Sequence, residues 1–244
     1  MDQLIAVISD IHSNLEALNV VLDDAKTLGV TNFICVGDIV GYNARPNECC
    51  DIIRNLGCVT VCGNHDHYTA ANSEDSSDFH PLAAKVIEWT RQQISPENLE
   101  WLRKLPYSAI IRGVTVVHST LDGPEHWGYV FDAVEAEPSF AYQHTQLCFH
   151  GHTHVPAIFE MHAGLVTRYD PVDFRLVLGH KYFVNIGSVG QPRDGDPRAS
   201  YCIYNPVQHT IHFRRLNYDV AKAQQQILDA GLPRHLADRL ATGT

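Results

Sequence analysis

Three short apolar segments near the N-terminus, each followed by polar residues, constrain the fold more than any other feature of the sequence. "LIAVIS" (residues 4–9), "NFICVGD" (32–38) and "CVTVCGN" (58–64) are rich in apolar and β-branched residues, as is typical of buried strands. Two helical segments separate them, the second being "PNECCDIIRNLG" (46–57). This β-α-β-α-β order predicts a largely parallel sheet with right-handed crossovers.

The first helix carries recognisable end signals. Ser13 and Glu16 match a capping box, so we expect Ser13 to be the N-cap, and Gly29 is expected to close the helix. Further along, an amphipathic helix is predicted near 81–94 and a last helix from about Asp219. The expected later strands are 107–112, 114–119, 146–150, 156–160, 174–178, 181–187, 199–205 and 209–216. No linker interrupts the pattern, so residues 1–244 are expected to form a single domain.

Composition excludes several classes of protein. No apolar run approaches the roughly 18 residues that span a bilayer, and the N-terminus lacks the features of a signal peptide. The seven cysteines form no C-x-x-C pair, which favours a reduced, cytoplasmic protein with buried thiols. The net charge of −10, without a basic stripe, argues against a general nucleic-acid-binding surface.

Polar residues stand at the carboxyl end of five predicted strands. In open α/β sheets the ligand site lies outside the carboxyl ends of the strands, so the fold is expected to gather these residues into one cleft. One such residue alone is usually a helix cap or a turn former, but five such positions together indicate a site. Strand by strand, they are Asp10 and His12, Asp38, Asn64 and His65, His118, and His152 and His154.

The chemistry of these residues indicates metal ions. Carboxylates, an amide and histidines without a thiolate suit borderline and hard divalent ions. There are too many ligands for one tetrahedral ion, but about the right number for two ions roughly 3.5–4 Å apart, with Asp38 as the natural bridge. Such a pair would lower the pKa of a bound water and hold phosphoryl oxygens, which favours hydrolysis of a phosphate ester or anhydride. We expect Mn²⁺, with Fe²⁺, Zn²⁺, Co²⁺ and Ni²⁺ as alternatives.

The motifs D-x-H, G-D, G-N-H-D, a strand-end histidine and G-H-T-H, in this order, resemble the calcineurin-like metallophosphoesterase superfamily. "NIGSVGQPRDGDPRASY" further resembles a small single-domain bacterial and archaeal branch that includes phosphodiesterases and diadenosine-tetraphosphate hydrolases. The resemblance implies an α/β fold, a four-layer αββα sandwich of two mixed β-sheets flanked by helices. It also implies that Asp38 bridges two ions, and that His65 donates a proton to the leaving oxygen or clamps the phosphoryl group. One ion would be held by Asp10, His12 and His154, the other by Asn64, His118 and His152.

The sequence departs from the protein phosphatases of this superfamily after the bridging aspartate. They follow it with G-D-x-V-D-R-G, whereas this chain has "GDIVGYNARP", so that Gly41 and Tyr42 replace the aspartate and arginine. This argues against a Ser/Thr phosphatase and leaves open which residue orients His65. Asp66 is adjacent, but neighbours on an extended chain point apart. Arg45 could replace the lost arginine or be an ordinary exposed residue.

Loops around the cleft must select the substrate. Trp127 and Tyr129 could stack on a nucleobase or simply pack their loop onto the body, and His67 and Tyr68 carry the same ambiguity. In "QPRDGDPR", Arg193 and Arg198 could bind a phosphate, or the alternating charges could form a salt-bridged loop.

Not every histidine is expected to act in the site. His150 directly precedes Gly151, which is expected to break the strand, so a structural or supporting role is assigned to it. His80 and the other isolated histidines are given structural roles.

The leading interpretation is a metal-dependent phosphohydrolase acting on phosphodiesters or phosphoanhydrides of small, nucleotide-type substrates through a metal-activated water. A phosphomonoesterase is the alternative, and a nuclease ranks low on an acidic chain without a basic groove. A non-catalytic protein-binding scaffold is the alternative from another class, but relatives of that kind lack some of the ligands or the histidine that this chain retains. The oligomeric state stays open.

Overall fold

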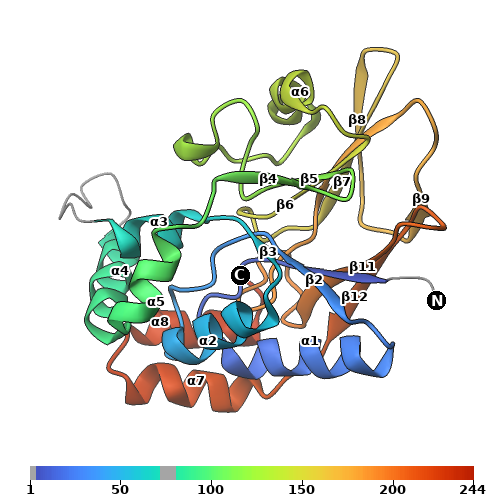
Figure 1. Ribbon diagram of the computed structural model, residues 1–244. Helices are drawn as coiled ribbons and strands as arrows, with labels where there is room; N and C mark the ends of the chain where they lie inside the picture. The colour runs from blue at the N-terminus through green and yellow to red at the C-terminus, as the bar shows by residue number, and fades with distance from the viewer. Residues whose placement is uncertain (1–3, 72–80) are drawn as a thin grey trace.

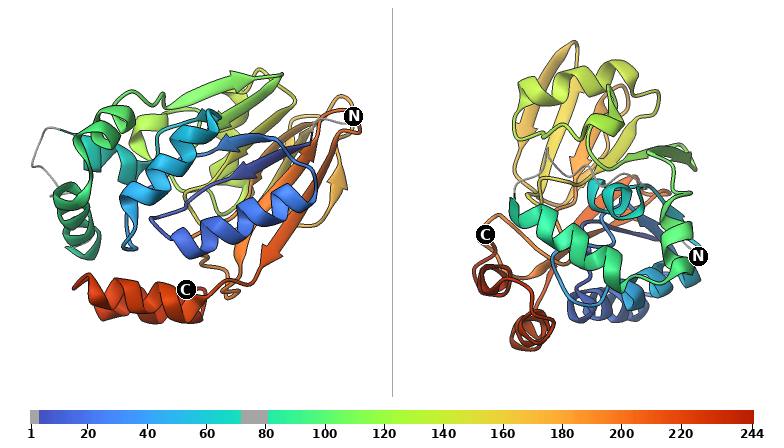
Figure 2. Two further views of the ribbon diagram at one scale, coloured as in Figure 1. Left: turned by 60° about the horizontal axis from the view of Figure 1, so that its bottom comes forward. Right: turned by 90° about the vertical axis from the view of Figure 1, so that its left-hand side faces the viewer.

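The computed structural model describes residues 4–71 and 81–244 and has two mixed β-sheets packed face to face between helices, in four layers (Figures 1 and 2). The first sheet runs in the order β3 (Val59–Thr60), β2 (Asn32–Cys35), β1 (Ile5–Ile8), β11 (Ala199–Asn205), β12 (Thr210–Leu216), β9 (Phe174–Arg175). The second runs in the order β4 (Ser108–Ile111), β5 (Val114–Val117), β6 (Leu147–His150), β10 (Lys181–Asn185), β7 (Ala157–His162), β8 (Leu165–Tyr169). The predicted fold class is confirmed. His80 lies outside the described residues.

Helices cover the outer faces of both sheets. On the first sheet lie α1 and α2, with α7 beside α1, and α6 lies on the second sheet (Figure 1). No described helix is long and apolar enough to cross a bilayer. The helices are α1 (Leu15–Thr27), α2 (Pro46–Leu56), α3 (Asn64–Ala70), α4 (Pro81–Gln93), α5 (Pro96–Leu102), α6 (Ala133–Tyr142), α7 (Val220–Asp229) and α8 (Arg234–Asp238), with short 3₁₀ turns η1 (Pro124–His126) and η2 (Arg239–Ala241).

The parallel opening predicted from the three apolar segments is confirmed. β1, β2 and β3 pair in parallel through the crossover helices α1 and α2. Both faces of β1 are buried because its side chains alternate between two cores. Val7 packs with Phe149 between the sheets, while Ile8 packs with Leu18 under the helices. The fully apolar "IAVI" segment therefore reflects burial on both sides.

The predicted cap of the first helix is wrong. Asn14, rather than Ser13, is the N-cap of α1, because its side chain accepts a hydrogen bond from the Ala17 amide at 3.1 Å. Ser13 instead has a φ of 56° and belongs to the tight turn that follows β1. Glu16 does not reach back to the cap but contacts Lys222 and Gln226 of α7. The predicted closure at Gly29, with a φ of 72°, is consistent with the helix end.

Other elements differ from the prediction in length, or were not predicted, because their side-chain pattern is weak. The third strand is only two residues long, because the chain turns into α3 at Asn64. The predicted strand 174–178 pairs only over Phe174–Arg175, and Leu178 beyond it is 94% exposed. Neither α6, which contains Pro138, nor the exposed edge strand β8 was predicted.

Packing between the sheets should dominate stability. Leu147 of β6 is 1% exposed within the inter-sheet core, so Leu147→Ala is expected to lower the free energy of unfolding by about 2–5 kcal/mol. Leu178→Ala is the matched control, and its effect should stay within about 0.5 kcal/mol. Chemical denaturation measures both, and equal effects of the two substitutions would contradict the assigned core.

Candidate metal centre

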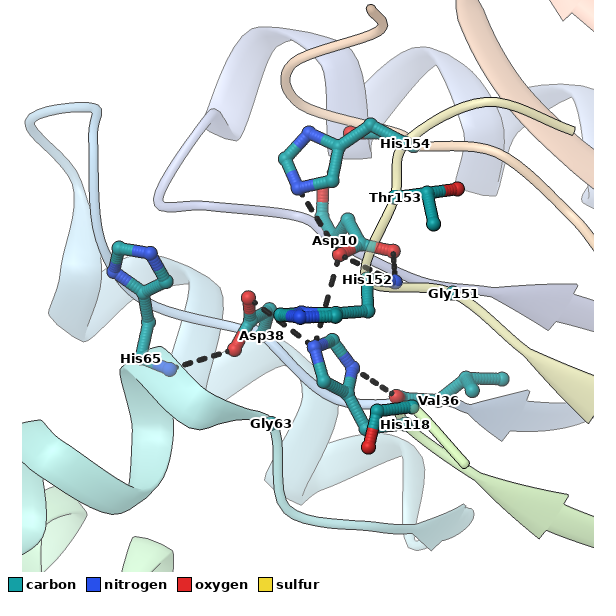
Figure 3. Close-up of polar contacts among 12 residues, drawn as sticks. Asp10, Val36, Asp38, Gly63, His65, His118, Gly151, His152, Thr153 and His154 are labelled. Atoms are coloured by element: carbon teal, nitrogen blue, oxygen red, sulfur yellow. Dashed lines mark hydrogen bonds and ion pairs between the residues drawn. The ribbon is translucent and has the colours of Figure 1, made fainter. Parts of the chain in front are cut away.

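The polar residues predicted to share a site lie together at the carboxyl ends of strands from both sheets. Turns after β1 and β2 bring Asp10, His12 and Asp38, and α3 begins with Asn64 and His65. The second sheet contributes His118 directly after β5, and the turn after β6 contributes His152 and His154 (Figure 3). Two groups of side chains could each hold a metal ion, and they share Asp38: Asp10, His12, Asp38 and His154 form one, and Asp38, His118 and His152 form the other.

Left-handed backbone conformations position five of these side chains. Asp10, His12 and Asp38 have φ values of 51°, 48° and 51°, and His152 and His154 have 68° and 61°. Such values are unfavourable for residues with a side chain, and they concentrate at functional sites where the surroundings enforce them. Here backbone hydrogen bonds lock the turns together, for example from the His12 amide to the Asp38 carbonyl at 2.9 Å.

Each of the four histidines in the two groups of possible ligands donates one ring N–H to a backbone carbonyl. Because a carbonyl oxygen can only accept, the bond fixes the tautomer of each neutral ring and leaves its other nitrogen with a free lone pair. Such outer hydrogen bonds orient histidines that bind metals. The bonds run from His12 Nδ1 to Val40 (3.0 Å), His118 Nδ1 to Val36 (2.8 Å), His154 Nδ1 to Gln191 (2.6 Å) and His152 Nε2 to Trp127 (3.0 Å).

The free lone pairs converge on the two carboxylates. His12 Nε2 and His154 Nε2 lie 3.0 Å apart, although both rings use their N–H elsewhere. One oxygen of Asp38, Oδ2, lies 3.4 Å from His12 Nε2 and 3.4 Å from His118 Nε2, at the junction of the two groups. Unscreened lone pairs at this distance repel each other, so the arrangement calls for positive charge between them.

The electrostatics of the cluster agree with this requirement. Burial opposes a charge on His118, but Asp38 and Asp10 outweigh it and raise the pKa of His118 to about 9, so the carboxylates favour a positive charge at its Nε2, either a proton or a metal ion in its place. Burial raises the pKa of Asp10, yet His154 and His118 hold that pKa below its usual range. In contrast, burial and the neighbouring positive groups lower the pKa of His152 to about 3, so that its ring is neutral and free to bind a cation.

Two of the expected ligand side chains have a buried polar atom without a hydrogen-bond partner, namely Asn64 Oδ1 and His118 Nε2. Unsatisfied buried polar atoms are rare in folded proteins, and each calls for an explanation. A divalent ion would provide it at both atoms, and the set of nitrogen and oxygen donors without sulfur suits such an ion. The residues present therefore fit a metal centre.

His65 and Asp66 follow Asn64 at the start of α3 but have different tasks. The Asp66 carboxylate accepts hydrogen bonds from the amides of Ile39 (2.9 Å), Val40 (3.1 Å) and Gly63 (3.1 Å), so it does not orient His65. It ties the loop after β2 to the start of α3. The His65 amide donates to Asp38 Oδ1 at 2.8 Å, which fixes its backbone beside the centre.

The ring of His65 depends on the glycine that replaces the phosphatase aspartate. A Cβ atom on Gly41, which has a φ of 99°, would lie 2.5 Å from His65 Nδ1. The ring of Tyr42 lies 4.4 Å from that of His65, centroid to centroid, and His65 Nδ1 has no hydrogen-bond partner. Packing, rather than a carboxylate, therefore orients His65. Burial and the charge of Arg193 lower its pKa to about 4.

A cavity of about 470 Å³ opens next to the centre. Trp127 and Tyr129, predicted as substrate contacts, line it, and the Tyr129 ring also stacks on His152 at 4.3 Å. His67 lines a second cavity of about 320 Å³, and its Nδ1 forms a hydrogen bond with the Tyr107 hydroxyl. Tyr68, considered with His67 from the sequence, also lines the larger cavity, whereas Glu125, another wall residue, belongs to no motif and was not singled out.

The predicted arginines fall into two kinds. Arg45 is exposed and pairs with Glu48 at 3.1 Å, so it does not replace the missing phosphatase arginine. Arg198 pairs with Asp196 at 2.6 Å, which supports the salt-bridged alternative for this residue. Arg193 makes no such pair within the described part of the chain and lies over Tyr42 instead.

His150 occupies the structural position expected for it. β6 ends at His150, and its ring stacks on Phe183 with centroids 3.9 Å apart. Burial lowers the pKa of His150 to about 3, so the ring is neutral. Gly151 then turns the chain so that His152 and His154 enter the cluster while His150 stays in the core.

Comparisons with known proteins agree with this geometry. The sequence model of the calcineurin-like phosphoesterase superfamily domain matches residues 4–208, and the chain belongs to this superfamily. It is therefore a metallophosphoesterase, a phosphoric ester hydrolase with a site able to hold metal.

Individual relatives match over nearly their whole length. The protein MJ0912 of Methanocaldococcus jannaschii, which is uncharacterised, is 42% identical, with 98% of each chain covered. A metallophosphoesterase from Sphaerobacter thermophilus is 39% identical, with both chains fully covered and a TM-score of 0.89. The protein PH1004 of Pyrococcus horikoshii shares the fold at 17% identity and a TM-score of 0.80, covering 99% of this chain and 98% of its own.

Asp66→Asn tests the hydrogen bonds that connect the loop after β2 to the start of α3. An amide has only one accepting oxygen, so at least one of the three buried amides loses its partner, and the free energy of unfolding should fall by about 1–3 kcal/mol. Asp170→Asn, at a carboxylate that is 84% exposed, should change it by less than about 1 kcal/mol. Denaturation midpoints report both, and a stability of Asp66→Asn equal to that of the wild type would contradict the assigned contacts.

Proposed function

We propose that the protein hydrolyses phosphodiester or phosphoanhydride bonds of small substrates with two divalent ions, bridged by Asp38. The observation that carries the proposal is the position of Asp38 Oδ2, at equal distance from a histidine of each group. The ligands we assign to one ion are Asp10, His12, Asp38 and His154, and to the other Asp38, Asn64, His118 and His152. Mn²⁺ is the ion we expect, with Fe²⁺, Zn²⁺, Co²⁺ and Ni²⁺ as alternatives.

The residues of the chain would divide the work of hydrolysis. Divalent ions at this position would supply a water of lowered pKa and a Lewis acid for phosphoryl oxygens. The ring of His65, held by packing against Gly41 and Tyr42, would donate a hydrogen bond or a proton to the leaving oxygen. The carbonyl contacts of the histidines would hold the site rigid during turnover.

The cavity beside the centre supports a substrate with a planar group. Its aromatic walls include Tyr68, Trp127 and Tyr129, and it opens directly onto Asn64, His65 and His152. A planar group such as a nucleobase could stack there while the phosphate reaches the centre. The room for a second substituent favours a diester or anhydride over a monoester. The proposed partner is a small phosphorylated molecule rather than a nucleic-acid polymer.

The metal-loaded enzyme provides the main test. Protein reloaded with Mn²⁺ should hydrolyse bis(p-nitrophenyl) phosphate faster than p-nitrophenyl phosphate and contain about two ions per chain by elemental analysis. Asp38→Asn should lower both activity and metal content. His65→Asn should lower kcat by about 10²–10⁴-fold and keep its metal, because it loses only the donor to the leaving oxygen.

Two results would contradict this function. One is inactivity of the wild type with every divalent ion tried. The other is a His65→Asn enzyme with unchanged kcat, which would remove His65 from the mechanism.

The cavity wall can be tested separately. Trp127→Leu removes the ring but keeps the backbone carbonyl that holds His152. It should raise the KM for the p-nitrophenyl ester of thymidine 5′-monophosphate by about tenfold, since a base–aromatic stack contributes roughly 1–3 kcal/mol. The KM for methyl p-nitrophenyl phosphate, which has no base, should change little. Equal changes for both substrates would exclude the cavity as a binding site for the planar group.

A further inference from the structure

Arg193, in the segment after β10, carries a positive charge that no described carboxylate neutralises. The two acidic neighbours of Arg193 in sequence are already occupied, since Asp194 pairs with Arg215 and Asp196 pairs with Arg198. Within residues 4–71 and 81–244 no carboxylate lies at ion-pair distance from Arg193. A full positive charge therefore stays in a protein whose net charge is −10.

The position of the guanidinium group is fixed at three points. The Arg193 amide donates to the carbonyl of His154 at 3.3 Å, which ties its backbone to a residue of the centre. Its Nη2 donates to Gln191 Oε1 at 3.1 Å, and its Cζ lies 5.5 Å above the centre of the Tyr42 ring. The Nε–H group of the same side chain is buried and has no hydrogen-bond partner. An arginine held this firmly, with an unused buried donor, has the properties of a binding group rather than of a solvated surface residue.

Tyr42 connects Arg193 to the cleft. The Tyr42 ring lies beneath the guanidinium group, and its centroid is 4.6 Å from that of the His12 ring and 4.4 Å from that of the His65 ring. Tyr42 also lines the cavity beside the centre. The guanidinium group is therefore close to the space in which a substrate phosphate would lie.

We propose that Arg193, stacked on the ring of Tyr42, binds a negatively charged phosphoryl oxygen of the substrate beside the centre. The proposal rests on the function proposed above and adds a specificity-determining residue to it. The ring face of Tyr42 stabilises the cation without neutralising its charge. A carboxylate in the same place would neutralise it. The one arginine in the loop after β2 is Arg45, which is exposed and paired with Glu48, so the guanidinium reaches the site from the segment after β10 instead.

A purely structural role makes a different prediction, because the same segment holds a histidine of the centre. The Gln191 carbonyl accepts from His154, so an Arg193 that only braces this segment would affect metal binding. A phosphate-binding Arg193 would affect the affinity for anions and leave metal content unchanged. The two roles are therefore separable by measurement.

The experiment uses the Mn²⁺-loaded full chain and inorganic phosphate as a competitive inhibitor of bis(p-nitrophenyl) phosphate hydrolysis. Arg193→Gln should raise the inhibition constant of phosphate and the KM of the diester by about tenfold or more, since a hydrogen bond to a charged group contributes roughly 1.5–3 kcal/mol. Metal content should equal that of the wild type, and Arg193→Lys should restore part of the affinity. Arg198→Gln, in the same loop but paired with Asp196, is the matched control and should leave both constants unchanged.

Variants of Tyr42 provide a second measurement that does not remove the arginine. Tyr42→Leu should raise the inhibition constant of phosphate more than Tyr42→Phe does, because phenylalanine keeps the ring face. An unchanged inhibition constant in Arg193→Gln, or a loss of metal in parallel with activity, would overturn the proposal. In either case an active wild type that Asp38→Asn inactivates would leave the proposed function intact.

Discussion

The hydrogen bonds from histidine rings to backbone carbonyls are the constraint on which the candidate centre depends. Each bond commits one ring nitrogen and leaves the other directed at Asp10 and Asp38. The carbonyls come from separate segments of the chain: Val36 and Val40 follow β2, Trp127 lies in the loop after β5, and Gln191 follows β10. The centre therefore forms only when these segments are correctly placed together.

This dependence connects the site to the hydrophobic core. The bond between His118 and Val36 joins the second sheet to the first, so the packing of the sheets around residues such as Phe149 sets its length. Asp66 plays a corresponding part within the first sheet, since it holds the loop of Asp38 against the start of α3. Core packing and polar contacts thus both determine where the side chains of the centre lie. The strained turns persist because both kinds of contact enforce them.

Sequence reasoning predicted the parts of this arrangement that depend on side-chain pattern. The parallel opening followed from the apolar segments, and the polar strand ends identified every residue of the two groups that share Asp38. The motif order and its resemblance to a family supplied the second sheet, while the assignment of ligands to two ions stays a prediction. The separation of His150 from His152 and His154 followed from Gly151 and from the position of His150 at the end of the strand.

What escaped prediction depends on the backbone or on distant contacts. The carbonyls that fix the tautomers have no side-chain signature, and the left-handed turn after β1 moved the helix cap from Ser13 to Asn14. The separate fates of Arg193 and Arg198 depended on which carboxylates lay nearby in three dimensions. Likewise, Asp66 serves three amides from two loops, which its position next to His65 did not indicate.

The central claim is that two groups of metal ligands share the carboxylate of Asp38. Anomalous diffraction from crystals loaded with Mn²⁺ tests it most directly. The account predicts two anomalous peaks, one beside His12 and His154 and one beside His118 and His152, with Asp38 bound to both. A single peak, or two peaks that Asp38 does not join, would contradict it.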